Sequence, residues 1–292
     1  MKLGIAVVYL FGEQNEALLD LYLSMIEKHT QIPYAIYGSV NRLRPEYVEK
    51  FEGYPQVRIC RCPETDLRRG EEHAFYLDHL VEMAAHDGAT HIVTLHLDSF
   101  PIRTGWAREL AASLSDSCVF ATIDRINTAC LFFRRDFYLQ HRPRLRLSVA
   151  ERASPQYKQY IQDWNPLQHS GIGYGFKAYS EGVSWHYLAL SARLDEANVF
   201  GLVHGDLVFH LGGATVLGES APPALGIMKG GGYSALLDRG LHVIESVIPV
   251  RGRQFLGIHF KAPMEHLVER PQAGARRSQL DRARQQLLQD LE

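Results

Sequence analysis

In the first half of the chain, short apolar segments of strand length alternate with longer segments whose apolar residues recur at helical spacing. Residues 3–10 (LGIAVVYL) form the first strand-like run, and residues 14–29 follow with a helical pattern. The same patterns predict strands at 33–38, 56–60, 90–97, 117–123 and 128–134, and helices at 71–86 and 105–114. Because parallel strands need crossover connections, this alternation predicts an α/β fold: a mixed, mostly parallel sheet flanked by helices.

In the second half the alternation fades and the composition changes. Residues 212–233 concentrate glycine, with Pro222 and Pro223 among them, which is typical of a loop or a lid. Leucines at helical spacing predict a terminal helix over 274–292. We therefore expect an α/β domain over 1–213 and a C-terminal extension over 214–292.

Composition narrows the range of partners. Lys and Arg number 31 against 33 Asp and Glu, and a formal net charge of −2 gives no reason to expect nucleic acid. Four cysteines are too few for a disulfide-stapled secreted domain, and the Cys60-Arg61-Cys62 segment is too short for an ordinary bridge. No apolar run reaches the ~18 residues of a membrane span. These features predict a cytoplasmic protein with no transmembrane segment.

Residues 90–110 carry the most informative pattern. A buried strand ends in His96-Leu97-Asp98-Ser99, and Pro101 and the pair Gly105-Trp106 then lead into a helix. Side chains two residues apart share one face of a strand, so the imidazole of His96 and the carboxylate of Asp98 should converge. A simpler interpretation also stands, because Asp-Ser ahead of a proline commonly caps a turn.

This succession of strand, acidic tip, proline, Gly-Trp and helix resembles the DxD region of bacterial GT-A glycosyltransferases of the family 2 type. Against a family-style string TLDSDSFPI, residues 94–102 read TLHLDSFPI, so His96 takes the first acidic position and Asp98 the second. The resemblance implies a GT-A-like fold and a divalent cation, Mn²⁺ or Mg²⁺, that neutralises the diphosphate of a nucleotide-sugar donor. Asp98 would bind the ion directly. His96 would bind the ion or contact the ribose, which favours Mn²⁺.

A later histidine extends the resemblance. The apolar run 207–211 contains His210 and precedes two glycines, as does the histidine that completes the metal site in many such enzymes. The resemblance therefore implies His210 as a third metal ligand, with His204 as its competitor. A lone histidine at a strand end is also commonly a hydrogen-bonded structural residue.

The segment before the acidic strand also has a family-like pattern. Residues 70–78 resemble the glycine and helix with which these enzymes contact the donor, which implies donor contacts for Arg69, His73 and Asp78. Arginine binds phosphate bidentately, and helix N-termini attract it. The alternative is a solvated charge cluster whose acids favour the helix dipole.

The catalytic base and the acceptor are less well defined by the sequence. An inverting transferase needs a group that takes the acceptor proton, and family members usually place an acid near 162–175. Asp163 is the first candidate and His169 the second, although both also fit a polar loop. Four aromatic side chains could stack on a sugar or pack in the core: Trp164, Tyr174, Trp185 and Tyr187.

The resemblance implies a glycosyltransferase of the hexosyltransferase type that uses a nucleotide-sugar donor, by association a UDP-sugar, and an unknown saccharide, small-molecule or peptide acceptor. Two alternatives use the same scaffold: a degenerate sugar-nucleotide binding protein and a metal-dependent phosphohydrolase. The orientation of His96 tests the first, and a second acidic cluster would favour the second. A nucleotidyltransferase ranks third, because no Gly-rich run with a phosphate-binding lysine follows the first strand.

Overall fold

The computed structural model describes residues 1–10, 16–43, 45–67, 69–123, 126–164, 170–193 and 201–211. Four sequence predictions lie outside these residues: the loop at 212–233, the helix at 274–292, the extension at 214–292, and His169.

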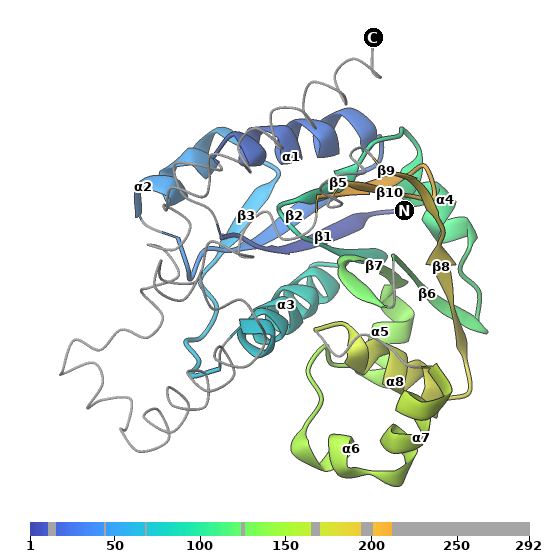
Figure 1. The fold of residues 1–292 in the computed structure, drawn as a ribbon. Coiled ribbons are helices and arrows are strands. Elements are labelled where there is room, and N and C mark those ends of the chain that lie inside the picture. Colours follow the sequence, from blue (N-terminus) through green and yellow to red (C-terminus); the bar gives the residue numbers. More distant parts are fainter. Residues whose placement is uncertain are drawn as a thin grey trace, which may run out of the picture.

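A seven-stranded sheet with the order β3-β2-β1-β4-β7-β6-β8 forms the centre of the fold (Figure 1). Its strands are β1 (Leu3–Val8), β2 (Tyr34–Ser39), β3 (Val57–Cys60), β4 (His91–Leu95), β6 (Cys118–Ile123), β7 (Asn127–Arg134) and β8 (Ser184–Leu188). The pairs β1–β2, β1–β4, β2–β3 and β6–β8 are parallel, whereas β7 is antiparallel to both β4 and β6. The predicted mixed, mostly parallel sheet is therefore confirmed.

Helices cover both faces of this sheet. Figure 1 shows α1 (Glu16–His29) on one side and α3 (Arg69–His86) and α5 (Arg135–His141) on the other. Along β1, Ile5 and Val7 pack into the core that includes α1, while Ala6 packs into the core that includes α3. Burial on both faces explains why the strand reads as a continuous apolar run. Within the described residues, no helix has the length and apolarity needed to cross a membrane.

Two short connections complete the first half of the fold. Between β2 and β3 run α2 (Pro45–Val48) and the 3₁₀ helix η2 (Glu49–Gly53), and α4 (Trp106–Ala112) links β5 (Ser99–Pro101) to β6. Gly105 has φ +86° just before α4, a conformation that favours glycine. This turn buries Trp106 completely, and its indole Nε1 donates to Thr30 Oγ1 at 3.1 Å. The predicted Gly-Trp helix start is confirmed.

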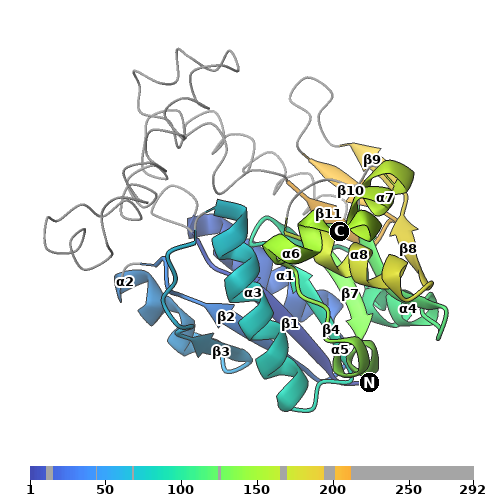
Figure 2. The ribbon, with the colours of Figure 1, turned by 90° about the horizontal axis from the view of Figure 1, so that it is seen from below.

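A second, smaller sheet brings distant parts of the chain together. Its order is β5-β11-β10-β9, with all neighbours antiparallel, and Figure 2 shows β9, β10 and β11 gathered at one end of the molecule. The remaining strands are β9 (Leu190–Arg193), β10 (Leu202–His204) and β11 (Val208–His210). In the β5–β11 pair, Ser99 lies opposite His210. This pairing places β11, from the end of the described chain, beside the segment that contains Asp98.

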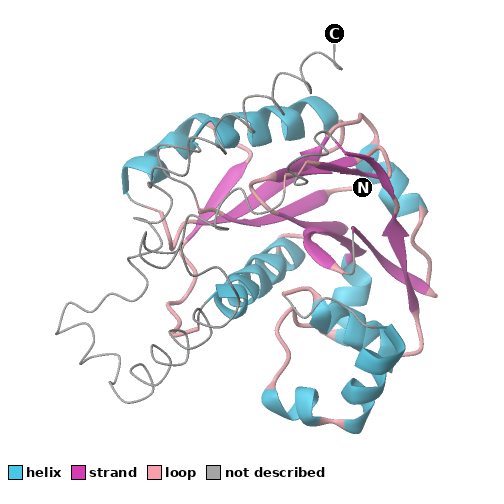
Figure 3. Ribbon diagram, in the orientation of Figure 1, coloured by secondary structure: helices cyan, strands magenta, loops and turns pink. Residues whose placement is uncertain are grey.

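Residues beyond 140 form helices that the sequence pattern does not predict (Figure 3). They are α6 (Val149–Ala153), α7 (Pro155–Trp164) and α8 (Ile172–Ser180). The polar α7 buries Tyr160, whose ring centroid lies 5.8 Å from that of Phe176 on α8. Most other α7 side chains are exposed or half-buried, so its apolar stripe is too narrow to stand out in the sequence.

The cysteines are consistent with the sequence expectation. All four are free thiols: Cys60, Cys62, Cys118 and Cys130. Complete burial raises the pKa of the Cys130 thiol to about 12, which disfavours the thiolate that a nucleophile needs. Cys130 is therefore a core residue, as predicted.

Candidate metal centre

The three predicted metal ligands, His96, Asp98 and His210, meet just beyond the carboxyl end of β4. One ligand atom from each lies within 4.8 Å of the other two, and this is the one such group of three or more found in the described part of the chain. Asp98 Oδ1 lies 3.9 Å from His96 Nδ1 and 4.0 Å from His210 Nε2. Two imidazoles and one carboxylate can therefore converge on a single divalent ion, a donor set suited to Mn²⁺, Fe²⁺ or Zn²⁺.

The backbone on both sides of Asp98 fixes this geometry. A turn follows β4, in which Ser99 N donates to His96 O at 3.0 Å, and the β5–β11 pairing continues as Leu211 N donates to Asp98 O at 2.8 Å. The Ser99 hydroxyl donates to the Ala129 carbonyl on β7. Asp98 is only 2% exposed. A buried carboxylate needs a compensating polar partner, and the two histidines place imidazole nitrogens on its side.

The orientation of His96 is set by a chain of hydroxyls. His96 Nε2 lies 2.9 Å from Thr128 Oγ1, which in turn lies 2.9 Å from Ser170 Oγ. When Thr128 accepts the Nε2 proton and donates its own to Ser170, His96 Nδ1 keeps its lone pair on the side of Asp98. The sequence gives no signal for Thr128 or Ser170, because they come from β7 and from the segment before α8.

We expect Thr128→Val to lower Mn²⁺ affinity about 10- to 100-fold, as is usual when a ligand histidine loses its outer hydrogen bond. The hydroxyl is the group that matters, so Thr128→Ser should bind Mn²⁺ close to the wild-type level. Calorimetric Mn²⁺ titration of both variants, with ¹⁵N NMR of the His96 tautomer, checks this. Wild-type affinity in Thr128→Val would show that the hydroxyl does not position His96.

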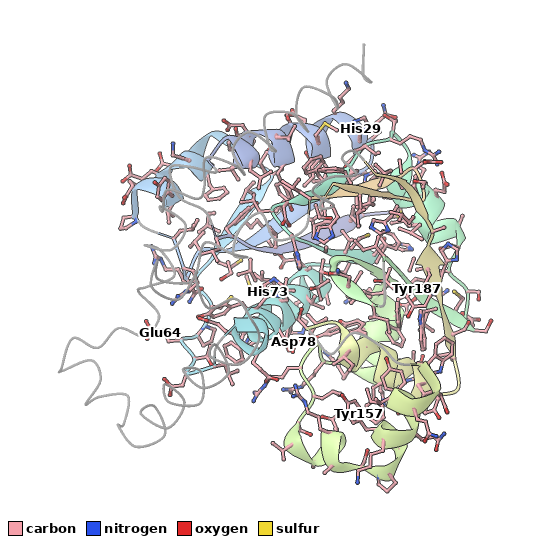
Figure 4. All side chains as sticks on the ribbon, viewed as in Figure 1. His29, Glu64, His73, Asp78, Tyr157 and Tyr187 are labelled. Atoms are coloured by element: carbon pink, nitrogen blue, oxygen red, sulfur yellow. The ribbon has the colours of Figure 1, made fainter. Side chains whose placement is uncertain are left out.

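The predicted donor contacts on α3 separate into two environments (Figure 4). The His73 ring packs edge-on against His96, with centroids 5.0 Å apart, so the structure brings His73 to the cluster. Arg69 begins α3, but its side chain is not among those described. Asp78 Oδ1 instead accepts a hydrogen bond from Leu145 N at 2.9 Å. It lines a cavity of about 1150 Å³ formed by α3, α5, α6, α7, α8 and the loop before α6. The structure therefore does not bring Asp78 to the group formed by His96, Asp98 and His210.

Burial raises the pKa of Asp78 to about 7, although backbone N–H groups of Leu145 and Arg146 oppose the shift. The pKa of Asp in an unfolded chain is about 3.9, so folding favours the protonated form of Asp78. The protonated form therefore adds to the free energy of unfolding at low pH, and this contribution is lost as pH rises through about 7. We expect Asp78→Asn, which mimics the protonated acid, to melt increasingly above wild type from pH 5 to pH 8. Thermal unfolding at both pH values tests this, and a pH-independent difference in Tm would contradict it.

The candidate base and the aromatic residues lie in the helical region. Asp163 is exposed at the end of α7 and accepts hydrogen bonds from Gln159 Nε2 at 2.7 Å and Tyr179 Oη at 2.8 Å. Tyr174 is completely buried in the core, so it cannot stack on a sugar. The three other predicted aromatic residues pack on one another: Trp164, Trp185 and Tyr187.

The structure also distinguishes the two histidines of the last strands. His210 at the end of β11 joins the cluster, and its ring centroid lies 5.9 Å from that of His96. His204 is buried on β10, opposite Val208. The pairing of β11 with β5, which the sequence pattern alone does not predict, is what carries His210 to Asp98.

The fold and the cluster together define an α/β protein with a candidate metal centre at the carboxyl end of a central strand. No protein-family model matches the chain, and no curated protein matches it. Among solved structures, the mannosyltransferase PcManGT from Pyrobaculum calidifontis, in complex with GDP-Man and Mn²⁺, is 10% identical with a TM-score of 0.35, over 48% of this chain and 46% of that one.

TarS from S. aureus gives similarly distant matches. One of its structures is 10% identical with a TM-score of 0.43, over 66% of this chain and 59% of TarS. The complex with UDP-GlcNAc is 10% identical with a TM-score of 0.35, over 49% and 48%. The chain thus spans about half the length of these neighbours.

Proposed function

We propose that this protein is a glycosyltransferase that moves a sugar from a nucleotide-diphosphate donor with the help of a divalent metal ion. The observation that carries the proposal is the convergence of His96, Asp98 and His210, each of which has one ligand atom within 4.8 Å of the other two. The cluster lies where β4 ends, and open α/β sheets bind their ligands at the carboxyl ends of their strands. His96 and Asp98 also carry the sequence resemblance to the DxD region, and His210 carries the resemblance to the later histidine.

The surrounding groups suit a nucleotide diphosphate. A bound ion would neutralise the charge that develops on the diphosphate as the glycosidic bond breaks. His73, in the first turns of α3, stands beside His96, and the N-terminus of a helix of 18 residues favours phosphate. We assign Arg69 to the same role. Two imidazoles in the donor set favour Mn²⁺ over Mg²⁺, which prefers oxygen ligands.

The alternatives fit the cluster less well. In a degenerate binding protein His96 would have no reason to face Asp98, yet its Nδ1 lies 3.9 Å from Asp98 Oδ1. A two-metal phosphohydrolase needs a second set of ligands, and the described residues contain one group of three. For the finer details we propose a UDP-linked hexose as donor and His169 as the acceptor base. Asp163, the other candidate, is the less suitable of the two because its carboxylate is hydrogen-bonded to Gln159 and Tyr179 in the helical region.

Calorimetric titration of UDP, GDP and CDP tests the proposal. We expect one of these nucleotides to bind in the presence of Mn²⁺, to bind more weakly with Mg²⁺, and not to bind measurably without a metal. Binding of the matching nucleoside monophosphate should be much weaker, because the ion acts on the diphosphate. Failure of all three diphosphates to bind with any metal would overturn the proposal that the protein is a glycosyltransferase.

A further inference from the structure

Three aromatic side chains form an exposed platform at the junction of α7 and β8. We call Trp164, Trp185 and Tyr187 the aromatic platform. The rings of Trp164 and Trp185 have centroids 4.6 Å apart, and those of Trp185 and Tyr187 lie 6.3 Å apart at nearly a right angle. Trp164 is 48% exposed and Tyr187 38% exposed, so the two outer rings present apolar surface to solvent.

The inner ring holds the platform rigidly on the sheet. Trp185 stacks on Phe120 with centroids 5.5 Å apart and planes 5° apart, and Phe120 is completely buried in the core that includes α3. The outer rings add little to that core, because each leaves more than a third of its surface in water. Large aromatic side chains kept exposed on a rigid support are typical of a binding surface.

The platform lies on the same face of the sheet as the metal cluster. In the sheet register, Tyr187 on β8 pairs with Thr122 on β6, and Thr122 pairs with Leu131 on β7. Leu131 in turn pairs with Thr94 on β4. Residues in one such row point to the same face, and His96 follows Thr94 by two residues. His96 contacts His73 on α3, which shows that this row of residues points to the face of the sheet that α3 covers. Three strand spacings put Tyr187 about 14 Å from the cluster in the direction across the strands.

The chemistry of the platform matches a neutral sugar. The C–H faces of a pyranose ring pack flat on aromatic rings, and its hydroxyls need hydrogen-bond acceptors and donors at the edge. Asp163, next to Trp164 in sequence, presents an exposed carboxylate that two neighbours, Gln159 and Tyr179, hold in place. A carboxylate accepts from sugar hydroxyls and repels anionic sugars.

We infer that the aromatic platform binds a neutral saccharide acceptor of several pyranose units. One unit stacks on Trp164, the next contacts Tyr187, and the chain of units extends across β6 and β7 toward the metal cluster. The platform residues act in binding and not in the chemical step. This inference rests on the proposed transferase for the role of the saccharide as acceptor, whereas saccharide binding itself rests on the platform alone.

Tryptophan fluorescence reports directly on this surface, because the chain has three tryptophans and Trp106 is completely buried. The probes are the neutral trisaccharides cellotriose, maltotriose and N,N′,N″-triacetylchitotriose, with trigalacturonate as the anionic comparison. We expect at least one neutral trisaccharide to change the emission saturably and trigalacturonate to bind at least about tenfold more weakly. Trp164→Ala should weaken the neutral ligand about tenfold, while Trp164→Phe, which keeps a ring, should lose less.

Two controls separate the platform from the donor site. Met83→Ala removes another exposed apolar side chain, 41% exposed on α3, and should leave saccharide binding unchanged. Nucleotide binding with Mn²⁺ should be the same in Trp164→Ala as in the wild type. Saccharide binding that depends on Trp164, without any metal-dependent nucleotide binding, would support the saccharide site and overturn the proposed transferase activity. Failure of the proposed function is therefore distinguishable from failure of the saccharide site.

Several results would overturn the inference. They are the failure of all three neutral trisaccharides to bind, unchanged affinity in Trp164→Ala, and equal affinity for trigalacturonate. A second copy of the chain as the occupant would give a dimer in sedimentation that Trp164→Ala converts to a monomer, and this too would overturn it.

Discussion

Replacing Asp98 by alanine should lower Mn²⁺ affinity by at least about 100-fold and abolish metal-dependent nucleotide binding. Asp98 supplies the one anionic ligand of the cluster, and its Oδ1 lies 3.9 Å from His96 Nδ1 and 4.0 Å from His210 Nε2. Loss of an outer-shell partner alone costs about 10- to 100-fold in metal affinity, so loss of the carboxylate ligand should cost more. Mn²⁺ titration followed by electron paramagnetic resonance measures the free ion directly.

The matched control is Asp116→Ala, which removes an aspartate whose side chain is 96% exposed and pairs with Arg134. It changes the net charge equally, and Mn²⁺ affinity should stay at the wild-type level. A thermal melt shows whether Asp98→Ala is folded, and Asp98→Asn offers a second variant of the same size. Wild-type Mn²⁺ affinity in folded Asp98→Ala would show that the cluster is not a metal centre.

The Gly173→Ala variant should have a much lower free energy of unfolding than the wild type. Gly173 lies in α8, where a Cβ would fall well inside van der Waals contact with the backbone carbonyl of Arg144. A backbone oxygen cannot move aside as a flexible side chain does. Overpacking a tight site costs about 1–3 kcal/mol and occasionally more, and here we expect about 3 kcal/mol. Urea unfolding followed by circular dichroism measures the free energy of unfolding.

Gly53→Ala is the control, because a Cβ at Gly53 meets no other atom within 4 Å. Its effect should stay within about 1 kcal/mol of the wild type, since alanine only restricts the unfolded chain at an open site. Equal stability of Gly173→Ala and Gly53→Ala would mean that α8 does not pack against the 144–145 backbone as described.

The elements that the sequence predicts well are those buried on both faces. Strands such as β1, β4 and β7 read as continuous apolar runs because helices cover both sides of them. The helices after residue 140 pack through single residues such as Tyr160, and α8 contains Gly173 and Gly175, which lower helix propensity. Those glycines permit close approach to the 144–145 backbone and to Ile126, a tertiary reason that no local pattern shows.

The candidate site divides in the same way between local and long-range information. His96 and Asp98 are two residues apart on one strand end, so spacing alone predicts that they converge. His210 reaches them through the β5–β11 pairing, and Thr128 and Ser170 through β7 and the segment before α8. The resemblance supplied His210, whereas the two hydroxyls had no signal. Asp78 faces Leu145 because of its position around α3, which the motif alone could not show.

Anomalous X-ray diffraction from crystals grown with Mn²⁺ and UDP would show directly whether the cluster is a metal centre. We expect one strong manganese peak within ligand distance of His96 Nδ1, Asp98 Oδ1 and His210 Nε2, with the diphosphate oxygens of UDP completing its coordination. A manganese peak and a nucleotide elsewhere on the protein, with these three side chains coordinating no ion, would contradict it.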